Sequence, residues 1–148
     1  MKKRLMGKFA AAAVLVPVLA TAGTGEAFAA GHAVTWKNKG NGKYLAYFNG
    51  KVRTTSATGA SMKWTETKRS DGTYTMKHRL TGKCLDSNGR GSVYLRSCNG
   101  GSHQKWHEIK YSAGWRLKNK ATGRTLGLGS GGLARTAVDL GYPHQRWS

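Results

Sequence analysis

Hydrophobic and polar residues alternate in three short stretches of the chain that recur at a regular interval. Each stretch ends four positions before a glycine. The stretches are residues 34–38, 74–78 and 115–119, and the glycines are Gly42, Gly82 and Gly123. Alternation over a few residues is typical of a strand with one buried face. Each stretch is therefore predicted to be a half-buried strand that enters a turn.

The same interval holds further along the chain, where Lys-Trp or Arg-Trp recurs. The tryptophans of this motif are Trp64, Trp106 and Trp147, and their spacing matches that of the three glycines to within two positions. Agreement at several separate places identifies three repeats of about forty residues each. Their bounds are approximately 33–72, 73–113 and 114–148.

No sustained helical period separates these landmarks, and turn pairs such as Asn41-Gly42 and Asp71-Gly72 divide the chain into strand-sized pieces. Three such repeats could close around a pseudo-threefold axis, stack as a solenoid or form propeller blades. Propellers take about 4 to 8 blades, and a solenoid has distinct capping repeats. Three equal units without caps therefore predict an all-β fold, a β-trefoil with pseudo-threefold symmetry.

Residues 1–29 have the order of a secretory signal peptide. Basic residues come first, an apolar run covers positions 9–20, and small residues follow up to Ala29. This apolar run is too short for a membrane span, because about 20 residues are needed to cross a bilayer as a helix. We therefore predict cleavage after Ala29, a secreted protein and no transmembrane segment.

Residues 30–148 have the length of one domain. Without the signal, 21 basic residues face five acidic ones, a net charge of +16. The basic residues are densest at 37–43, 63–69 and 116–124, so an anionic cell-surface polymer is a possible partner. No recognition helix, RNA-binding motif or zinc finger occurs, which argues against sequence-specific nucleic-acid binding.

Two cysteines, Cys84 and Cys98, would enter an oxidising compartment and are predicted to form a disulfide. Two thiols supply only half of a tetrahedral metal site, so we predict no metal. The glycine-rich stretch 127–132 is followed by neither a lysine nor a helical pattern, so it is not a phosphate-binding loop. No cofactor is predicted.

The second repeat carries a resemblance to a known family. Its motifs are Thr-Gly-Lys-Cys-Leu-Asp-Ser-Asn at 81–88, Val-Tyr at 93–94 and Cys-Asn-Gly-Gly-Ser-His-Gln-Lys-Trp at 98–106. These motifs resemble the ricin-type lectins, whose β-trefoil repeats end in Gln-x-Trp, and most of all their three-repeat members that recognise mannose-rich glycans. The resemblance implies a carbohydrate-binding protein whose partner is a glycan or polysaccharide.

Carried over by position, the resemblance implies that Asp86, Tyr94 and Asn99 bind the sugar. His103 stands where the family has a tyrosine, and Arg96 replaces a leucine that packs on the sugar. Carboxylate, amide and aromatic groups suit paired sugar hydroxyls and C–H faces. Three tryptophans and two glutamines are assigned to the structural repeat core: Trp64, Trp106, Trp147, Gln104 and Gln145.

The first and third repeats lack the acidic residue, having Ala46 and Gly127 at its position, and the first has Met62 in place of the glutamine. The resemblance thus implies one sugar site. Structural roles stay open for the same residues, because Asp86 can cap a turn and Asn99 heads an Asn-Gly-Gly turn. His103 can be an ordinary loop histidine.

Catalysis finds little support in the sequence. The acids that follow the signal are Glu66, Asp71, Asp86, Glu108 and Asp139. The repeat register distributes them over different repeats and leaves no obvious carboxylate pair of the kind a glycosidase uses. We predict a monomeric binding protein and no enzyme. The alternative is a basic trefoil that acts as an interaction protein or inhibitor on an anionic surface or a protein partner.

Overall fold

The structure is a computed structural model that describes residues 31–148. The predicted signal peptide, residues 1–29, lies outside the described residues. The described chain consists of short β-strands, turns and three-residue 3₁₀ helices. The strands are β1 (His32–Val34), β2 (Tyr44–Phe48), β3 (Lys51–Thr55), β4 (Trp64–Lys68), β5 (Tyr74–His78), β6 (Cys84–Ser87), β7 (Val93–Arg96), β8 (Trp106–Tyr111), β9 (Gly114–Asn119), β10 (Thr125–Leu128) and β11 (Ala134–Ala137). The 3₁₀ helices are η2 (Ala60–Met62), η3 (Ser102–Gln104), η4 (Ser130–Gly132) and η5 (Pro143–Gln145).

One layer of the fold is a closed ring of antiparallel strands. β1 pairs with β4, β4 with β5, β5 with β8 and β8 with β9. The segment around Trp147 closes the ring, because this residue bridges to both Trp115 in β9 and Asn38 after β1. The Trp147 N–H donates to the Trp115 carbonyl at 3.0 Å, and the Ser148 N–H donates to the Lys37 carbonyl at 2.9 Å. The ring therefore has no open edge at this point.

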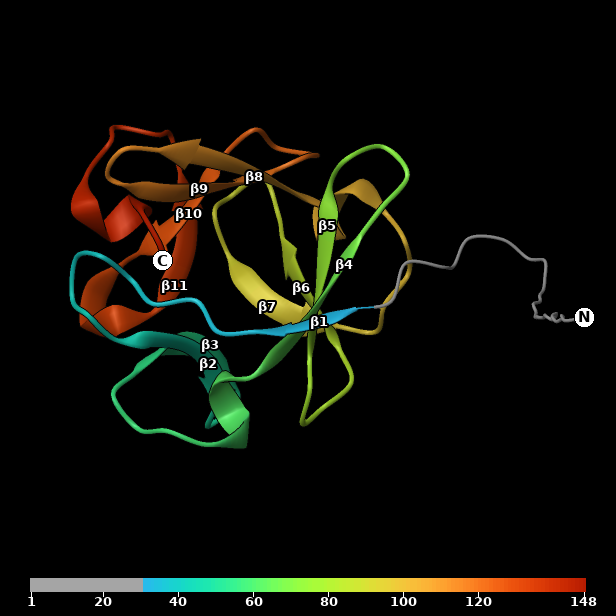
Figure 1. Cartoon of the computed structure of the whole chain (residues 1–148), viewed down its shortest axis with the longest axis horizontal. Helices are drawn as coiled ribbons and strands as arrows, with labels where there is room; N and C mark the ends of the chain where they lie inside the picture. The colour runs from blue at the N-terminus through green and yellow to red at the C-terminus, as the bar shows by residue number, and fades with distance from the viewer. Residues whose placement is uncertain (1–30) are drawn as a thin grey trace, which may run out of the picture. The chain divides into compact units, whose positions relative to one another are not determined.

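The second layer consists of three hairpins, one from each repeat: β2–β3, β6–β7 and β10–β11. Arg53 of the first hairpin bridges to Leu133, and Ser92 bridges to Arg135 of the third. The hairpins therefore meet one another, as the teal, yellow and orange-red strands of Figure 1 show. A strand ring with three converging hairpins is a β-trefoil, which confirms the predicted fold class.

The repeated tryptophans fill the core between the two layers. Each of the three is fully buried, and each indole N–H donates to a leucine carbonyl in the hairpin of its own repeat. The pairs are Trp64 with Leu45 (3.0 Å), Trp106 with Leu85 (3.2 Å) and Trp147 with Leu126 (3.0 Å). A buried indole N–H needs such a partner, so the same bond joins ring to hairpin three times.

A buried polar side chain ties each repeat to the preceding one around the ring. The Asn38 amide donates to the His144 carbonyl, and the Asn119 amide donates to the His103 carbonyl, both at 2.9 Å. In the second repeat His78 takes this place, and its Nε2 lies 2.8 Å from the Ser61 carbonyl. Burial lowers the pKa of His78, and its bond to Ser61 partly opposes that effect.

The ring also brings two acids together, which the sequence did not indicate. Glu66 and Glu108 each lie two positions after a repeat tryptophan, on β4 and β8. Burial and the neighbouring Glu66 carboxyl raise the pKa of Glu108 to about 9. The expectation that no two carboxyls would pair is therefore wrong, because equivalent positions of two repeats converge. The pair is enclosed by strands rather than placed in a substrate cleft: Glu66 is buried and Glu108 half-buried.

Within residues 31–148 no helix has both the length and the apolar character that a bilayer crossing requires.

Candidate functional site

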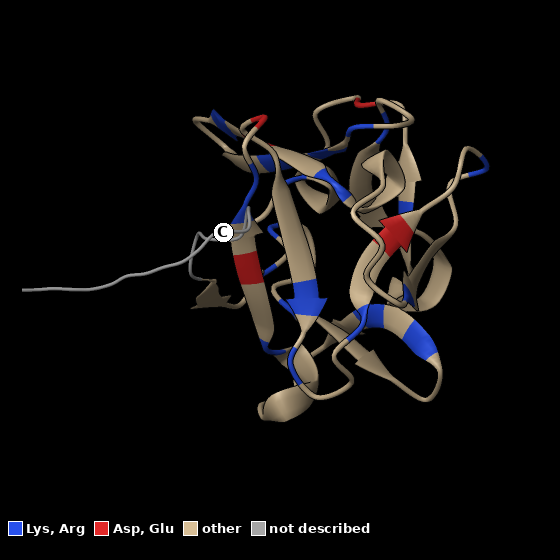
Figure 2. Ribbon diagram, turned by 90° about the vertical axis from the view of Figure 1, so that its right-hand side faces the viewer, with Lys and Arg blue, Asp and Glu red and all other residues tan. Residues whose placement is uncertain are grey.

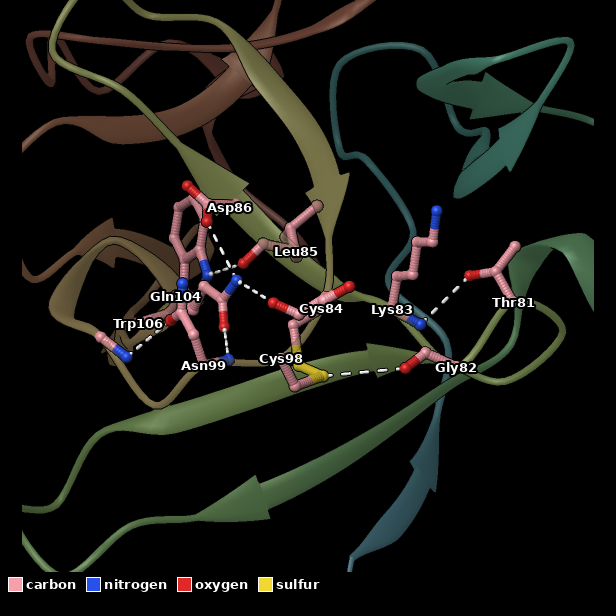
Figure 3. Close-up of a disulfide and its surroundings, with 12 residues drawn as sticks. Thr81, Gly82, Lys83, Cys84, Leu85, Asp86, Cys98, Asn99, Gln104 and Trp106 are labelled. Atoms are coloured by element: carbon pink, nitrogen blue, oxygen red, sulfur yellow. Dashed lines mark hydrogen bonds between the residues drawn. A yellow bond between two sulfur atoms is a disulfide. The ribbon is translucent and has the colours of Figure 1, made fainter.

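The second hairpin aligns the residues to which sugar binding was assigned. In its antiparallel register Asp86 of β6 lies opposite Tyr94 of β7, and Cys84 lies opposite Arg96. Cys84 is joined to Cys98 by a disulfide, which confirms the predicted pairing (Figure 3). The disulfide fastens the loop after β7, which carries Asn99, to the strand that carries Asp86. Closing this loop restricts the unfolded chain and stabilises the hairpin region.

Asp86 is a buried carboxylate, and only one of its two oxygens accepts a hydrogen bond within residues 31–148. Its Oδ2 accepts a hydrogen bond from the Gln104 amide at 3.0 Å. Its Oδ1 is buried and has no hydrogen-bond partner among the described residues. Asp86 as a whole is only 1% exposed. An unsatisfied buried carboxylate oxygen costs stability, and it is the acceptor that a ligand hydroxyl would use.

Tyr94 is the aromatic neighbour of this carboxylate. The pKa of Tyr94 is raised, first by partial burial of the phenol, then by the negative charge of Asp86 and by the phenol's hydrogen-bonding interaction with that carboxylate. The phenol therefore lies close to the carboxylate. Because Asp86 is only 1% exposed, a sugar hydroxyl reaches Oδ1 only if neighbouring side chains move.

Gln104 holds the buried side of the candidate site together through hydrogen bonds, whereas the sequence suggested only a structural role for it. Its amide NH₂ donates to Asp86 at 3.0 Å and to the Ser97 carbonyl at 3.1 Å, and its Oε1 accepts the Asn99 N–H at 2.9 Å (Figure 3). Gln104 itself is buried. It therefore fixes both the carboxylate and the loop that presents Asn99.

Asn99 and His103 lie at the exposed rim. The Asn99 Oδ1 accepts the Gly101 N–H at 2.8 Å, so this oxygen serves the turn and the side-chain NH₂ is left for a ligand. The His103 Nδ1 lies 2.8 Å from the Ser87 carbonyl, which requires the proton on Nδ1 and leaves Nε2 as an acceptor.

Arg96 is exposed and forms no ion pair within residues 31–148. It lies on the same face of β7 as Tyr94, two positions further on, and opposite the disulfide rather than the carboxylate.

A hollow of about 700 Å³ adjoins the rim. His103 and Gly89 form its second-repeat side, and its third-repeat side consists of Arg116, residues 121–124, Val138 and Asp139. This hollow lies between repeats, so the sequence pattern of one repeat could not reveal it. Its volume is in the usual range of small-molecule pockets.

The third repeat shows why an equivalent site is missing there. Gln145 makes bonds that match those of Gln104, donating to the Val138 carbonyl and accepting the Leu140 N–H. Gly127 replaces Asp86, and a Cβ at this position would lie 3.0 Å from the Gln145 Cγ. A side chain at position 127 would therefore require Gln145 or the neighbouring His144 to shift.

The first repeat keeps neither group, because Ala46 and Met62 stand in their places and are both buried. The described residues contain no cluster of three or more potential metal ligands, in either this site or the rest of residues 31–148.

The strand ring and the three hairpins define a β-trefoil whose second repeat carries a buried carboxylate, Asp86. Residues 63–142, more than half of the chain, match the model of the ricin-type β-trefoil lectin domain-like family. The chain belongs to this family, which confirms the resemblance to ricin-type lectins; the closer likeness to their three-repeat, mannose-recognising members stays a prediction. The family is one of carbohydrate-binding domains, and this membership points to binding rather than catalysis.

Solved structures share the fold at low sequence identity. A designed threefold-symmetric protein, ThreeFoil, superposes with a TM-score of 0.73 at 24% identity, over 78% of this chain and 95% of that one. SeviL bound to the asialo-GM1 saccharide gives 0.68 at 21% identity, over 80% and 94%. A GlcNAcα1-4Gal-releasing endo-β-galactosidase from Clostridium perfringens gives 0.72 at 21% identity; 78% of this chain matches only 31% of that enzyme. Comparison with curated protein sequences gives no match.

Proposed function

We propose that this chain is a secreted lectin that binds a glycan through its second repeat. The observation that carries the proposal is the Asp86 Oδ1, a buried acceptor without a partner among the described residues. Tyr94 lies opposite Asp86 in the hairpin, and the same repeat supplies two further groups that can bind sugar hydroxyls, the Asn99 amide and the His103 ring. The SeviL structure, which is named for a bound saccharide, supports the same use of this fold.

The site suits a weak, monovalent interaction with a neutral sugar unit. Asp86 would accept hydrogen bonds from two neighbouring hydroxyls, and the Tyr94 ring would contact the C–H face of the sugar. The hollow beside His103 would receive a second sugar unit, and Arg96 would lie near the rim. The floor formed by Gln104 and the disulfide is in place before binding, which lowers the entropy lost on association.

The test is a glycan array followed by titration of the best ligand. We expect one glycan per chain for a monomer, and we expect Asp86→Asn to weaken binding by about tenfold or more, since the charged acceptor is lost. Asn has nearly the same shape as Asp, and its side-chain oxygen can still accept the hydrogen bond from the Gln104 amide. Asp71→Asn, which makes the same change of charge outside the second hairpin, is the matched control and should bind normally.

A folded Asp86→Asn protein that binds the same glycan with an unchanged Kd would contradict this assignment. Folding of both variants is checked by thermal unfolding. Export is supported by the composition of residues 1–29 and by the disulfide; an intact mass that begins at Ala30 would identify the mature protein.

A further inference from the structure

A second hollow lies where the three hairpins converge. Its volume is about 490 Å³, and all three repeats line it. Lys51 comes from the first repeat, Arg90 and Tyr94 from the second, and Arg135 from the third. The bridges of Arg53 with Leu133 and of Ser92 with Arg135 hold its walls together. The hollow therefore lies on the pseudo-threefold axis, beside the candidate sugar site and sharing Tyr94 with it.

Cations line this hollow without any acidic residue among its lining. Lys51, Arg90 and Arg135 are exposed, and none of them forms an ion pair within residues 31–148. Figure 2 shows how strongly Lys and Arg outnumber Asp and Glu on the ribbon. An unneutralised group of like charges destabilises a folded chain, and a bound anion would remove this cost.

The acids that could neutralise these cations are occupied elsewhere. Asp71 pairs with Lys120 at 2.6 Å, and Asp139 pairs with Arg146 at 2.8 Å. Glu66 and Glu108 neighbour each other in the strand ring. Asp86, which lies opposite Tyr94, is buried and held by Gln104.

Two positively charged side chains come close to Gly91. A Cβ on this residue would lie 3.2 Å from the Arg124 Nη2, 3.3 Å from the Arg135 Nη2 and 2.6 Å from the Thr136 carbonyl. Two guanidinium groups thus reach the same point at the wall of the hollow. Arg124 donates to the Thr136 carbonyl at 3.1 Å, but its Nε is buried without a partner among the described residues.

The third-repeat wall is shaped around its arginine. Gly129 lines the hollow, and a Cβ there would lie 2.8 Å from the Arg135 Cδ. Because Gly129 has no side chain, the aliphatic part of the Arg135 side chain can lie against it. The guanidinium fork matches the oxygens of a tetrahedral oxyanion.

We propose that the axial hollow binds a sulfate or phosphate ester carried by an anionic polysaccharide. Lys51, Arg90 and Arg135 would surround the ester, and its sugar ring would occupy the remaining volume. The sequence could not show this site, because the three cations come from different repeats and from unlike positions within them. The proposal does not rest on the sugar site at Asp86.

The test compares short dextran chains that carry sulfate esters, phosphate esters or no charge. The protein is titrated with each at about 0.05 M and about 0.3 M salt. We expect binding of the esterified chains, weakened by salt, and no binding of neutral dextran. The tighter of the two esters identifies the natural group.

The variant that tests the site replaces all three cations: Lys51→Gln, Arg90→Gln and Arg135→Gln. The control removes the same charge from exposed positions that do not line the hollow: Lys68→Gln, Lys77→Gln and Arg79→Gln. We expect a loss of about tenfold or more for the first and less than about threefold for the second.

Equal losses in the two triple variants would overturn the proposal, since charge alone would then account for binding. So would equal binding of neutral dextran, or no binding by the unaltered protein. Backbone amide shifts in the unaltered protein give a second measurement that needs no variant. Shifts centred on residues 90–94 and 129–135 support the site, and shifts confined to other segments overturn it.

Discussion

At the scale of single residues, the structure places acids in environments that differ sharply. Asp71 and Asp139 face basic side chains, and hydrogen bonds to Lys120 and to Arg146 hold the pKa of each well below its usual value. Glu108 has no such cation partner; burial and Glu66 raise its pKa to about 9. One chain therefore contains acids that stabilise it when charged and an acid that destabilises it when charged.

The Glu108 prediction concerns stability as a function of pH. The pKa of Glu108 is about 9 in the folded protein and 4.5 in the unfolded chain. The contribution of Glu108 to the free energy of unfolding is therefore fully present below pH 4.5 and is lost as the pH rises through 9. Glu108→Gln removes the loss and should stabilise the protein near pH 8 by about 1–2 kcal/mol, allowing for the partial exposure of the group.

Urea unfolding of both proteins between about pH 5 and about pH 9 measures this effect. Asp71→Asn is a control with the opposite expected sign. It should destabilise the protein, because the favourable ion pair of Asp71 with Lys120 is removed. If the stability of the Glu108→Gln protein falls with rising pH as much as that of the unaltered protein, the two carboxyls do not interact as described.

At the scale of elements, each repeat combines strands of the ring, a hairpin and a 3₁₀ helix. A few hydrogen bonds that recur from repeat to repeat join these elements. The second repeat adds the disulfide and the Gln104 bonds to this common frame. Gln145 makes two matching bonds in the third repeat, yet only the second presents a carboxylate. The site is thus a local addition to a frame that all three repeats share in large part.

Removal of the disulfide tests this view. Cys84→Ser with Cys98→Ser should lower stability by about 2–4 kcal/mol, as expected for a closed loop of this size. Glycan binding at Asp86 should weaken as well, since the loop that carries Asn99 is no longer fastened to β6. Chemical unfolding and titration measure the two effects; an unchanged midpoint would mean that the link contributes nothing to the fold.

The sequence allowed the repeats, the β-trefoil and the disulfide to be predicted, because those depend on spacing within and between repeats. The bonds of Gln104 and the close contacts at Gly127 could not be predicted, since they depend on where a loop returns against a strand. The axial hollow and the Glu66–Glu108 pair also escaped prediction. Both join residues of different repeats, and sequence spacing does not report which equivalent positions converge on an axis.

At the scale of the whole molecule, the ring of strands and the hairpins share one core. Trp147 contributes to it in three ways: it fills the core, it donates to the Leu126 carbonyl, and it bridges Trp115 and Asn38. Trp64 and Trp106 lie within longer strands, whereas Trp147 closes the ring with single bridges. The third tryptophan should therefore be the most sensitive of the three.

We expect Trp147→Ala to destabilise the protein by about 3–5 kcal/mol, the usual cost of removing a large buried aromatic side chain. Tyr142→Ala, an exposed aromatic residue of the same repeat, is the control and should change stability by less than about 0.5 kcal/mol. Thermal and urea unfolding give the comparison. Similar losses in both variants would contradict the role given to Trp147.

Closure of the ring by Trp147 also sets an order of events during synthesis. The segment that follows β1 bonds to Trp147 and Ser148, so it lacks these partners until the ribosome has released both residues. Contacts between such distant segments form late and slowly. A growing chain therefore cannot close its ring of strands before Trp147 and Ser148 have been made.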